Sequence, residues 1–390
     1  MKLNRVLWLL VFICIIDSMG FGMMIPLIYA YGKQFGLTKQ SLGWLTAVFS
    51  VAQFFTTPVL GALSDKFGRK LLLVVCLFGT AVSFALFGLA GSLIVLFAAR
   101  ALDGITGGDI SVAQAMITDI SSSNTRTRYF GILGSAFGLG YVIGPAAGGL
   151  LSRFGMSVPF FFAAGLSLIA ALLSMFCLKE TNTNNKAKKH IKRHAFTYRS
   201  LITVLKQPVV GPAIFTGFLL TTAQFVMLIG FQTFCTDALK LSPTQVGLFY
   251  AGFGVTGILM QLMVPLINKV ISSRSIVLLV STSLCFGAMV FAGLTMTVLP
   301  FAIVIGVYGL FNGLRNPMLN AIIADHSKTS EQGEVMGINQ SYVSIGQAVG
   351  PAIAGMVAAI SLHITFFLAA FLILTGLGIG IRLKAQESPG

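Results

Sequence analysis

Charged residues are scarce in this 390-residue chain, since Asp, Glu, Lys and Arg together make up 9% of it while 56% is hydrophobic. A soluble globule of this size needs more polar surface, so the composition excludes that class and predicts a membrane protein with many spans. The apolar runs reach about 20 residues or more and lack the ten-residue alternation of an outer-membrane barrel. Because lipid satisfies no backbone polar group, these runs are predicted to be helices.

Cysteine and histidine are also rare, and their spacing indicates no metal site or disulfide framework. The five cysteines all lie in apolar runs, without C-x-x-C spacing or nearby His pairs: Cys14, Cys76, Cys177, Cys235 and Cys285. The chain has no Walker-type phosphate loop, which argues against an ATP-driven motor. We therefore expect neither metal nor cofactor, and a carrier in place of an enzyme.

Twelve apolar runs predict twelve membrane helices in two bundles of six. They lie near residues 6–31, 41–63, 71–90, 93–118, 129–151, 157–178, 208–235, 245–270, 275–296, 299–325, 334–359 and 363–383. The predicted domains are an N-terminal bundle over residues 1–178, a cytoplasmic linker over residues 179–207 and a C-terminal bundle over residues 208–390. The linker is basic, with five Lys and Arg between residues 186 and 193. It is predicted to be a solvated loop, and an anionic-lipid site there is the alternative.

Lys and Arg are distributed unevenly between the two sides of the membrane. Most of the 26 flank the termini and the loops on one side, whereas the other side has only Lys33, Lys39, Arg153 and Lys240. By the positive-inside rule both termini are cytoplasmic, and a bacterial inner membrane is the expected location. The net charge of +15 thus follows from topology, and no nucleic-acid partner is expected.

The two bundles are sequence repeats with an offset of 206 residues. GPAAGG at residues 144–149 corresponds to GPAIAG at residues 350–355, and the same offset relates Gly131-Ile132 to Gly337-Ile338 and Asp119 to Asp325. Parallel six-helix repeats about an axis along the membrane normal are typical of alternating-access transporters with a site between the halves.

Several motifs resemble those of a known transporter family. They are the loop GALSDKFGRK at residues 61–70, LFAAR at residues 96–100 followed by Gly104, and GYVIGPAAGG at residues 140–149. Together with Asp17 and Pro26, they resemble the twelve-helix drug:proton antiporters of the major facilitator superfamily, and most closely the tetracycline/proton antiporters. Those exporters carry an acidic residue in helix three where this chain has Ser83 but no acid. Tetracycline itself is therefore not the expected substrate.

The resemblance implies a cytoplasmic gate in which Arg69 meets Asp119. Gly61, Asp65 and Gly68 belong to the same loop, and topology-setting charge alone is the competing interpretation. The resemblance also links the helix-five motif to coupling. Its members are Gly140, Gly144, Pro145, Gly148 and Gly149. Glycines four residues apart share one helix face, so close helix packing explains them equally well.

Two carboxylates are predicted to lie at similar depth in the first bundle. Asp17 and Asp109 are each about 10 residues from a cytoplasmic helix end, which corresponds to about 15 Å. Close carboxylates repel, and this favours a proton on one of them. Asp17 and Asp109 are thus candidates for proton coupling. The alternatives are a permanently protonated packing residue at Asp17 and a simple cavity-lining role for Asp109.

The fourth helix carries a second charged pair. Arg100 and Asp103 are three residues apart and share a face, so each can neutralise the other inside the membrane. We assign this pair to the proton-coupling region, with a structural role for Asp103 slightly favoured over proton exchange.

In the second bundle, the offset of 206 relates Asp109 to Arg315. Arg315 is a candidate for binding an anionic part of the substrate or for facing Asp109 across a cavity. The alternative is bonding to helix carbonyls and Asn side chains. Neutral polar side chains add further candidate substrate contacts: Gln224, Asn312, Asn316, Asn339 and Tyr342.

The predicted function is proton-coupled export of a small amphipathic organic compound or drug by alternating access. The alternative is a metabolite, organic-anion or siderophore carrier that uses Arg315, with Asp17 in gating only. A small-molecule substrate, protons and the lipid bilayer are the expected partners, and the expected oligomeric state is a monomer.

Overall fold

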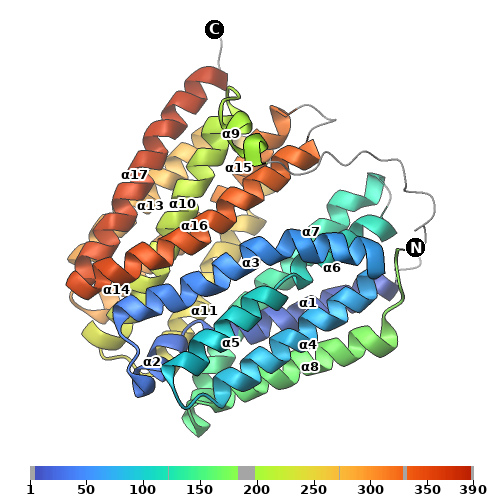
Figure 1. The fold of residues 1–390 in the computed structure, drawn as a ribbon. Coiled ribbons are helices and arrows are strands. Elements are labelled where there is room, and N and C mark those ends of the chain that lie inside the picture. Colours follow the sequence, from blue (N-terminus) through green and yellow to red (C-terminus); the bar gives the residue numbers. More distant parts are fainter. Residues whose placement is uncertain (1–4, 122, 183–197, 272, 328–331, 388–390) are drawn as a thin grey trace. The chain divides into compact units, whose positions relative to one another are not determined.

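The computed structural model of the chain describes residues 5–121, 123–182, 198–271, 273–327 and 332–387 (Figure 1). Within these ranges the secondary structure is helical, with no strand. Eleven helical segments of the described residues, one of them formed by α14 with α15, are long and apolar enough to cross a membrane. The remaining predicted span is divided into α5 (Leu93–Thr106) and α6 (Asp109–Ile120), each too short to be counted alone. The protein is therefore an all-α membrane protein whose helices match the twelve predicted spans.

The first six spans occupy the segment from Arg5 to Cys177. They are formed by α1 (Arg5–Met24) with α2 (Ile28–Gly32), α3 (Lys39–Phe67), α4 (Arg69–Gly88), α5 with α6, α7 (Ser123–Leu151) and α8 (Val158–Cys177). Short 3₁₀ helices, η1 (Lys33–Phe35) and η2 (Ser152–Phe154), follow α2 and α7.

The second six spans occupy the segment from Val210 to Glu387. They are formed by α10 (Val210–Thr233) with the π-helix η3 (Phe234–Ala238), α11 (Pro243–Leu262) with α12 (Val264–Val270), α13 (Arg274–Leu294), α14 (Val298–Asn312) with α15 (Arg315–Asp325), α16 (Gln332–Ile360) and α17 (Leu362–Glu387). Each coincides with one of the predicted spans.

Two features differ from the sequence-based prediction. Four predicted spans are interrupted within the membrane segment, between α1 and α2, α5 and α6, α11 and α12, and α14 and α15. The predicted linker also contains a helix, α9 (Tyr198–Leu205), whose Val204 is buried against its neighbours. An eight-residue helix is too short for a hydropathy window to detect. The basic residues 186–193 lie outside the described residues.

By contacts the chain divides into two compact units. Unit 1 comprises Met1–Leu37, Val48–Arg193 and Leu241–Ala251, and unit 2 comprises Thr38–Ala47, His194–Lys240 and Gly252–Gly390. The start of α3 thus belongs to unit 2, and the start of α11 belongs to unit 1. The division into domains at residues 178 and 208 stays a prediction.

The interior of unit 1 is built on α1, which packs against α7 and α8, and on α4, which packs against α5 and α8 (Figure 1). An aromatic cluster closes one end of this core. Phe160 lies 4.7 Å from Tyr31 and 4.8 Å from Phe87 between ring centroids, and the Tyr31 hydroxyl donates to the Gly88 carbonyl at 3.1 Å.

Unit 2 has an equivalent core, in which α10 packs against α16 and α17, and α13 packs against α14 and α17 (Figure 1). Phe366 lies 5.5 Å from Phe234 and 5.6 Å from Phe301 between ring centroids. Phe160 and Phe366 are separated by the repeat offset of 206 residues, so the repeat seen in the motifs extends into the aromatic cores.

Candidate functional site

The main candidate site is a pair of carboxyl groups inside unit 1. The side chains of Asp17 on α1 and Asp109 on α6 lie close enough to interact with each other through a hydrogen bond. Asp109 is 9% exposed, and the Asp17 Oδ1 atom is buried without a hydrogen-bond partner among the described residues. A hydrogen bond between two carboxyl groups requires a proton on one of them. The pair can therefore hold one proton between its members, and it retains an acceptor atom for another donor.

The break between α5 and α6 positions Asp109. Gly107 and Gly108 separate the two helices, and the Gln53 amide donates to the Gly107 carbonyl at 2.9 Å, which satisfies one backbone group exposed by the break. Asp109 is then the first residue of α6, where its carboxyl group lies beside the backbone amides of Asp109 and Ile110. The positive end of a helix stabilises a negative group at this position. The break thus provides a polar environment for a carboxylate in an otherwise apolar span.

Arg100 and Asp103 form the second buried pair, as their spacing predicts. The Arg100 Nη1 atom lies 2.9 Å from Asp103 Oδ2, and both residues are 3% exposed. The guanidinium also lies over the ring of Phe49, with 4.3 Å from Cζ to the ring centroid, and 5.7 Å from that of Phe21. A cation between aromatic faces gains cation–π attraction. Arg100 is therefore fixed by an acid and two rings.

The glycines of the helix-five motif lie against α1. A Cβ atom at Gly140, Gly144 or Gly148 would overlap with atoms of α1, in the segment from Ser18 to Met23. The stripe therefore lets the α7 backbone approach the helix that carries Asp17. Gly149 and Pro145 contact another element, the start of α11, where Thr244 Oγ1 donates to the Gly149 carbonyl at 2.7 Å.

The start of α11 and the start of α3 make equivalent glycine contacts, each within its own unit. In unit 1, Gly247 packs against Pro145 and Gly149 of α7. In unit 2, Gly43 packs against Pro351 and Gly355 of α16. The two copies of the GPxxxG pattern, at residues 144–149 and 350–355, thus allow the same kind of close helix crossing.

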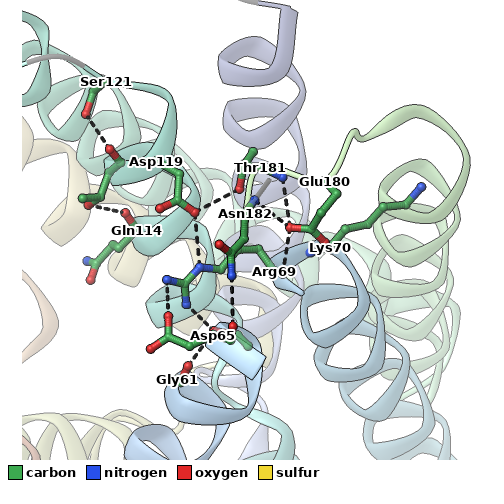
Figure 2. Close-up of polar contacts among 12 residues, drawn as sticks. Gly61, Asp65, Arg69, Lys70, Gln114, Asp119, Ser121, Glu180, Thr181 and Asn182 are labelled. Atoms are coloured by element: carbon green, nitrogen blue, oxygen red, sulfur yellow. Dashed lines mark hydrogen bonds and ion pairs between the residues drawn. The ribbon is translucent and has the colours of Figure 1, made fainter. Parts of the chain in front are cut away.

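The loop motif at residues 61–70 forms a network around Arg69 in unit 1 (Figure 2). Arg69 Nε lies 3.3 Å from Asp119 Oδ2, which is the contact that the resemblance implies, and Arg69 Nη2 forms an ion pair with Asp65. Arg69 Nη1 donates to Ser64 Oγ at 2.5 Å. Gly61 accepts a hydrogen bond from Ser64 Oγ at 2.7 Å, and a Cβ at Gly61 would touch nothing within 4 Å.

Glu180, which the sequence analysis did not select, completes this network (Figure 2). Its carboxylate accepts from the backbone amides of Arg69 at 3.0 Å and Lys70 at 3.1 Å, the first residues of α4. The N-cap residue Gly68 offers no side chain for this purpose and has φ +106°. Glu180 thus supplies from the end of α8 the carboxylate that helix N-termini favour. The only sequence signal is an acid following the sixth apolar run.

Arg315 in unit 2 adopts the alternative arrangement considered from the sequence. It is 6% exposed and donates to the Leu220 carbonyl at 2.7 Å, to Gln224 Oε1 at 2.5 Å and, through Nε, to Asn316 Oδ1 at 3.3 Å. Arg315 and Asp109 belong to different units, so their expected meeting across a cavity stays a prediction.

The remaining polar candidates of unit 2 are distributed over several locations. Asn312 lies with Arg315 along one pocket. Asn339 donates to Asn320 at 3.1 Å in an exposed position, and the Tyr342 hydroxyl donates to the Leu201 carbonyl of α9 at 3.3 Å. Gln224, Asn312, Asn316 and Arg315 therefore form one group, whereas Asn339 and Tyr342 have separate partners.

Comparison with known proteins identifies the family. The sequence profile described as Major Facilitator Superfamily matches residues 7–307 and 214–389. The chain belongs to the Major Facilitator Superfamily. It is accordingly an integral membrane protein of a transporter family.

Curated relatives in this superfamily cover nearly the whole chain. Multidrug resistance protein 2 of Bacillus subtilis (strain 168) is 29% identical over 95% of this chain and 93% of its own length. Tetracycline resistance protein, class C, of Escherichia coli is 29% identical over 93% of this chain and 91% of its own. Quinolone resistance protein NorA of Staphylococcus aureus (strain MSSA476) is 25% identical over 99% and 98%.

Solved structures of the superfamily share the fold. A bacterial homologue of the human lysosomal transporter Spinster, in an inward-facing and occupied conformation, has a TM-score of 0.83 at 13% identity, over 98% of this chain and 96% of that one. The human organic anion transporter MFSD10 (TETRAN) has a TM-score of 0.73 at 21% identity, over 96% and 99%. At these identities the likeness concerns the fold alone.

Proposed function

We propose that the protein is a proton-coupled exporter of small amphipathic organic compounds, including drugs, which works by alternating access. The observation that supports this proposal is the close, buried pair of carboxyl groups of Asp17 and Asp109 inside unit 1. Ionisable groups at such a depth are costly and rare unless they serve transport. The names of the relatives, which refer to multidrug, tetracycline and quinolone resistance, support drugs as the substrate class.

The carboxyl pair has the chemistry of a proton carrier. When it holds one proton, the pair carries a single negative charge. Loading a second proton makes it neutral and removes the cost of a buried charge during a conformational change. Asp17 Oδ1 is the acceptor atom without a partner in the described structure and is the proposed entry point for that proton. One proton moving down a potential of 100 mV provides about 2.3 kcal/mol, enough for an export ratio of some tens.

The other candidate residues have supporting roles in this proposal. Arg100 and Asp103 hold α5 against the rings of α1 and α3. The Arg69 network with Asp65 and Asp119 is the proposed cytoplasmic latch, which must open and close during the cycle. The Gly140, Gly144 and Gly148 stripe keeps α7 in register with the helix that carries Asp17, which is how a packing motif can also affect coupling.

The test is transport by the purified protein in liposomes with an imposed pH gradient. Norfloxacin is a suitable probe because it is a quinolone, the compound class that the name of one relative refers to. We expect accumulation that follows the gradient and collapses when a protonophore dissipates it. In the Asp17→Asn variant, we expect the substrate to equilibrate down its own gradient without accumulation.

The Ser83→Ala variant is a matched control, since Ser83 is a buried helix residue whose hydroxyl donates to the Ala99 carbonyl at 2.8 Å. It should retain gradient-driven accumulation. Transport that ignores the pH gradient, together with an unchanged pH dependence in Asp17→Asn, would contradict the proposal.

The proposal includes the topology inferred from the basic loops. The protein is placed in the bacterial inner membrane as a monomer with both termini in the cytoplasm. Reporter fusions at the two ends test this orientation, and a reporter active only outside the cytoplasm should be silent at both.

A metabolite, organic-anion or siderophore carrier is the second candidate, favoured by the buried charge of Arg315 in unit 2. In that case Asp17 would act in gating only. Uptake or release of an organic anion that is lost in Arg315→Gln and is indifferent to the pH gradient would favour this candidate over drug export.

A further inference from the structure

Arg315 is a buried cation without a carboxylate partner. It is 6% exposed, and within the residues that the structure describes, no Asp or Glu forms an ion pair with it. Its hydrogen-bond acceptors, the Leu220 carbonyl and the amide oxygens of Gln224 and Asn316, are all neutral. These bonds disperse the charge of the guanidinium but do not cancel it. A buried charge without compensation is strongly destabilising.

The position of Arg315 in its helix adds to this imbalance. Arg315 is the first residue of α15, as Asp109 is the first residue of α6 in the other repeat. The positive end of a helix favours a negative group, which Asp109 provides in unit 1. In unit 2 the same place holds a second positive charge. The site thus combines the positive N-terminus of α15 with the Arg315 guanidinium. The corresponding site in unit 1 combines the positive N-terminus of α6 with the Asp109 carboxyl group.

A pocket lies beside the guanidinium within unit 2. Its lining includes the polar side chains of Thr282, Tyr308 and Asn312, together with Arg315. Ser281 and Cys285 also line it, but they donate to the Leu278 and Tyr308 carbonyls. Most of these come from α13 and α14 and are buried; Tyr308 is 1% exposed, Ser281 2% and Thr282 5%. These three hydrogen bonds of Arg315 use one N–H group each of Nε, Nη1 and Nη2. A guanidinium has five N–H groups, so two directions remain for a ligand.

We propose that this pocket is a binding site for a small monovalent anion. The ligand is a halide or a single carboxylate group, bound by the Arg315 guanidinium, the N-terminus of α15 and the hydroxyl donors of the pocket wall. Either ligand would cancel the buried charge. The source is a free ion or the carboxylate of a transported molecule, and these share the same recognition chemistry. The proposal is independent of proton coupling, because it concerns only unit 2.

The test is the thermal unfolding midpoint of the purified full-length protein in sodium chloride, sodium acetate or sodium gluconate at equal ionic strength. Gluconate is too bulky for the pocket and is the reference salt. A ligand that binds only the folded state raises the midpoint, and we expect a rise of about 2 °C in chloride or acetate. A rise in chloride identifies a free halide. A rise in acetate alone identifies a carboxylate, and norfloxacin should then stabilise the protein while its methyl ester does not.

Arg315→Met removes the charge and keeps a similar length, and Arg382→Met, on an exposed position of α17, is the matched control. The anion-dependent rise should vanish in the first variant and persist in the second. If Arg315 only binds the helix carbonyl and amides, Arg315→Met will lower the midpoint equally in all three salts, which overturns the proposal. The absence of any rise in the wild type overturns it as well. If Arg315→Met does not fold, anomalous scattering from bromide beside Arg315 in crystals of the wild type decides the matter.

Discussion

Glu180 lies where a side chain on Gly68 would have to be. A Cβ atom built on Gly68 would come 2.6 Å from the Glu180 carboxylate, and Gly68 has φ +106°, a conformation that L side chains rarely adopt. The loop motif thus needs glycine at this position for two reasons, its own backbone conformation and the approach of an acid from the end of α8. The Arg69 network is thereby connected to the segment that leads into the linker.

Removing the Glu180 carboxylate should weaken the start of α4. Glu180→Ala leaves the amides of Arg69 and Lys70 without their acceptor, and loss of an N-terminal cap costs about 1 kcal/mol. Glu180→Gln keeps one acceptor oxygen and should cost less. Urea unfolding in detergent measures both, and Lys179→Ala at the exposed neighbouring position is the control. Equal stability of Glu180→Ala and Lys179→Ala would contradict the capping role.

Adding a methyl group to the glycine stripe should separate α7 from α1. Gly144→Ala would overlap with the Met19 carbonyl and with Gly22, both backbone groups that cannot rotate away. We expect a loss of about 1 to 3 kcal/mol, as for other overpacked positions. Gly131→Ala in the same helix meets nothing within 4 Å and should be neutral or slightly stabilising. Thermal unfolding of the two variants checks this, and similar midpoints would show that the crossing tolerates extra volume.

Asp103→Asn should leave Arg100 as an uncompensated buried cation. Breaking a buried ion pair from one side costs about 3 to 5 kcal/mol, although the pair as a whole contributes much less. The double variant Arg100→Met, Asp103→Leu should therefore be more stable than Asp103→Asn alone. A double-mutant cycle of Arg100→Met, Asp103→Leu and the double variant, measured by denaturant unfolding, gives the coupling energy of the pair. If the two single changes simply add, the pair is not an energetic unit.

Asp109→Asn should separate the structural role of this residue from its proton role. Asn can still accept hydrogen bonds from the backbone amides at the start of α6, so folding should be little affected. It cannot take up the proton proposed to be carried by the acid pair. In pH-gradient liposomes, we expect accumulation to fall by about tenfold or more while downhill movement persists. Full accumulation in Asp109→Asn would assign the proton to Asp17 alone.

Much of the fold follows from the sequence because hydropathy reports directly on burial in lipid. All twelve spans were predicted for that reason, but the breaks inside four of them were not. Gly107 and Gly108 are as compatible with a continuous membrane helix as with a break, and only the tertiary bond from Gln53 and the position of Asp109 show which occurs.

The candidate site was partly predictable. Depth counting brought Asp17 and Asp109 together because both lie in helices of known rise. Spacing alone paired Arg100 with Asp103. Glu180 caps a helix that begins 111 residues earlier, and no local pattern indicates such a contact. The direction of the Arg315 side chain also could not be predicted. The sequence shows which helix face carries Arg315, but it does not show which neutral acceptors on α10 the guanidinium binds.

The break at Gly107 and Gly108 affects whether the number of counted membrane crossings is even or odd. An even number of crossings returns a polypeptide to the side of the membrane on which it started, and an odd number does not. A count of the long apolar helical segments among the described residues gives eleven, because the break leaves α5 and α6 too short, and it would assign the two ends to opposite compartments. Two glycines that create the setting for an acid thus also change which side of the membrane a simple count of spans assigns to the C-terminus.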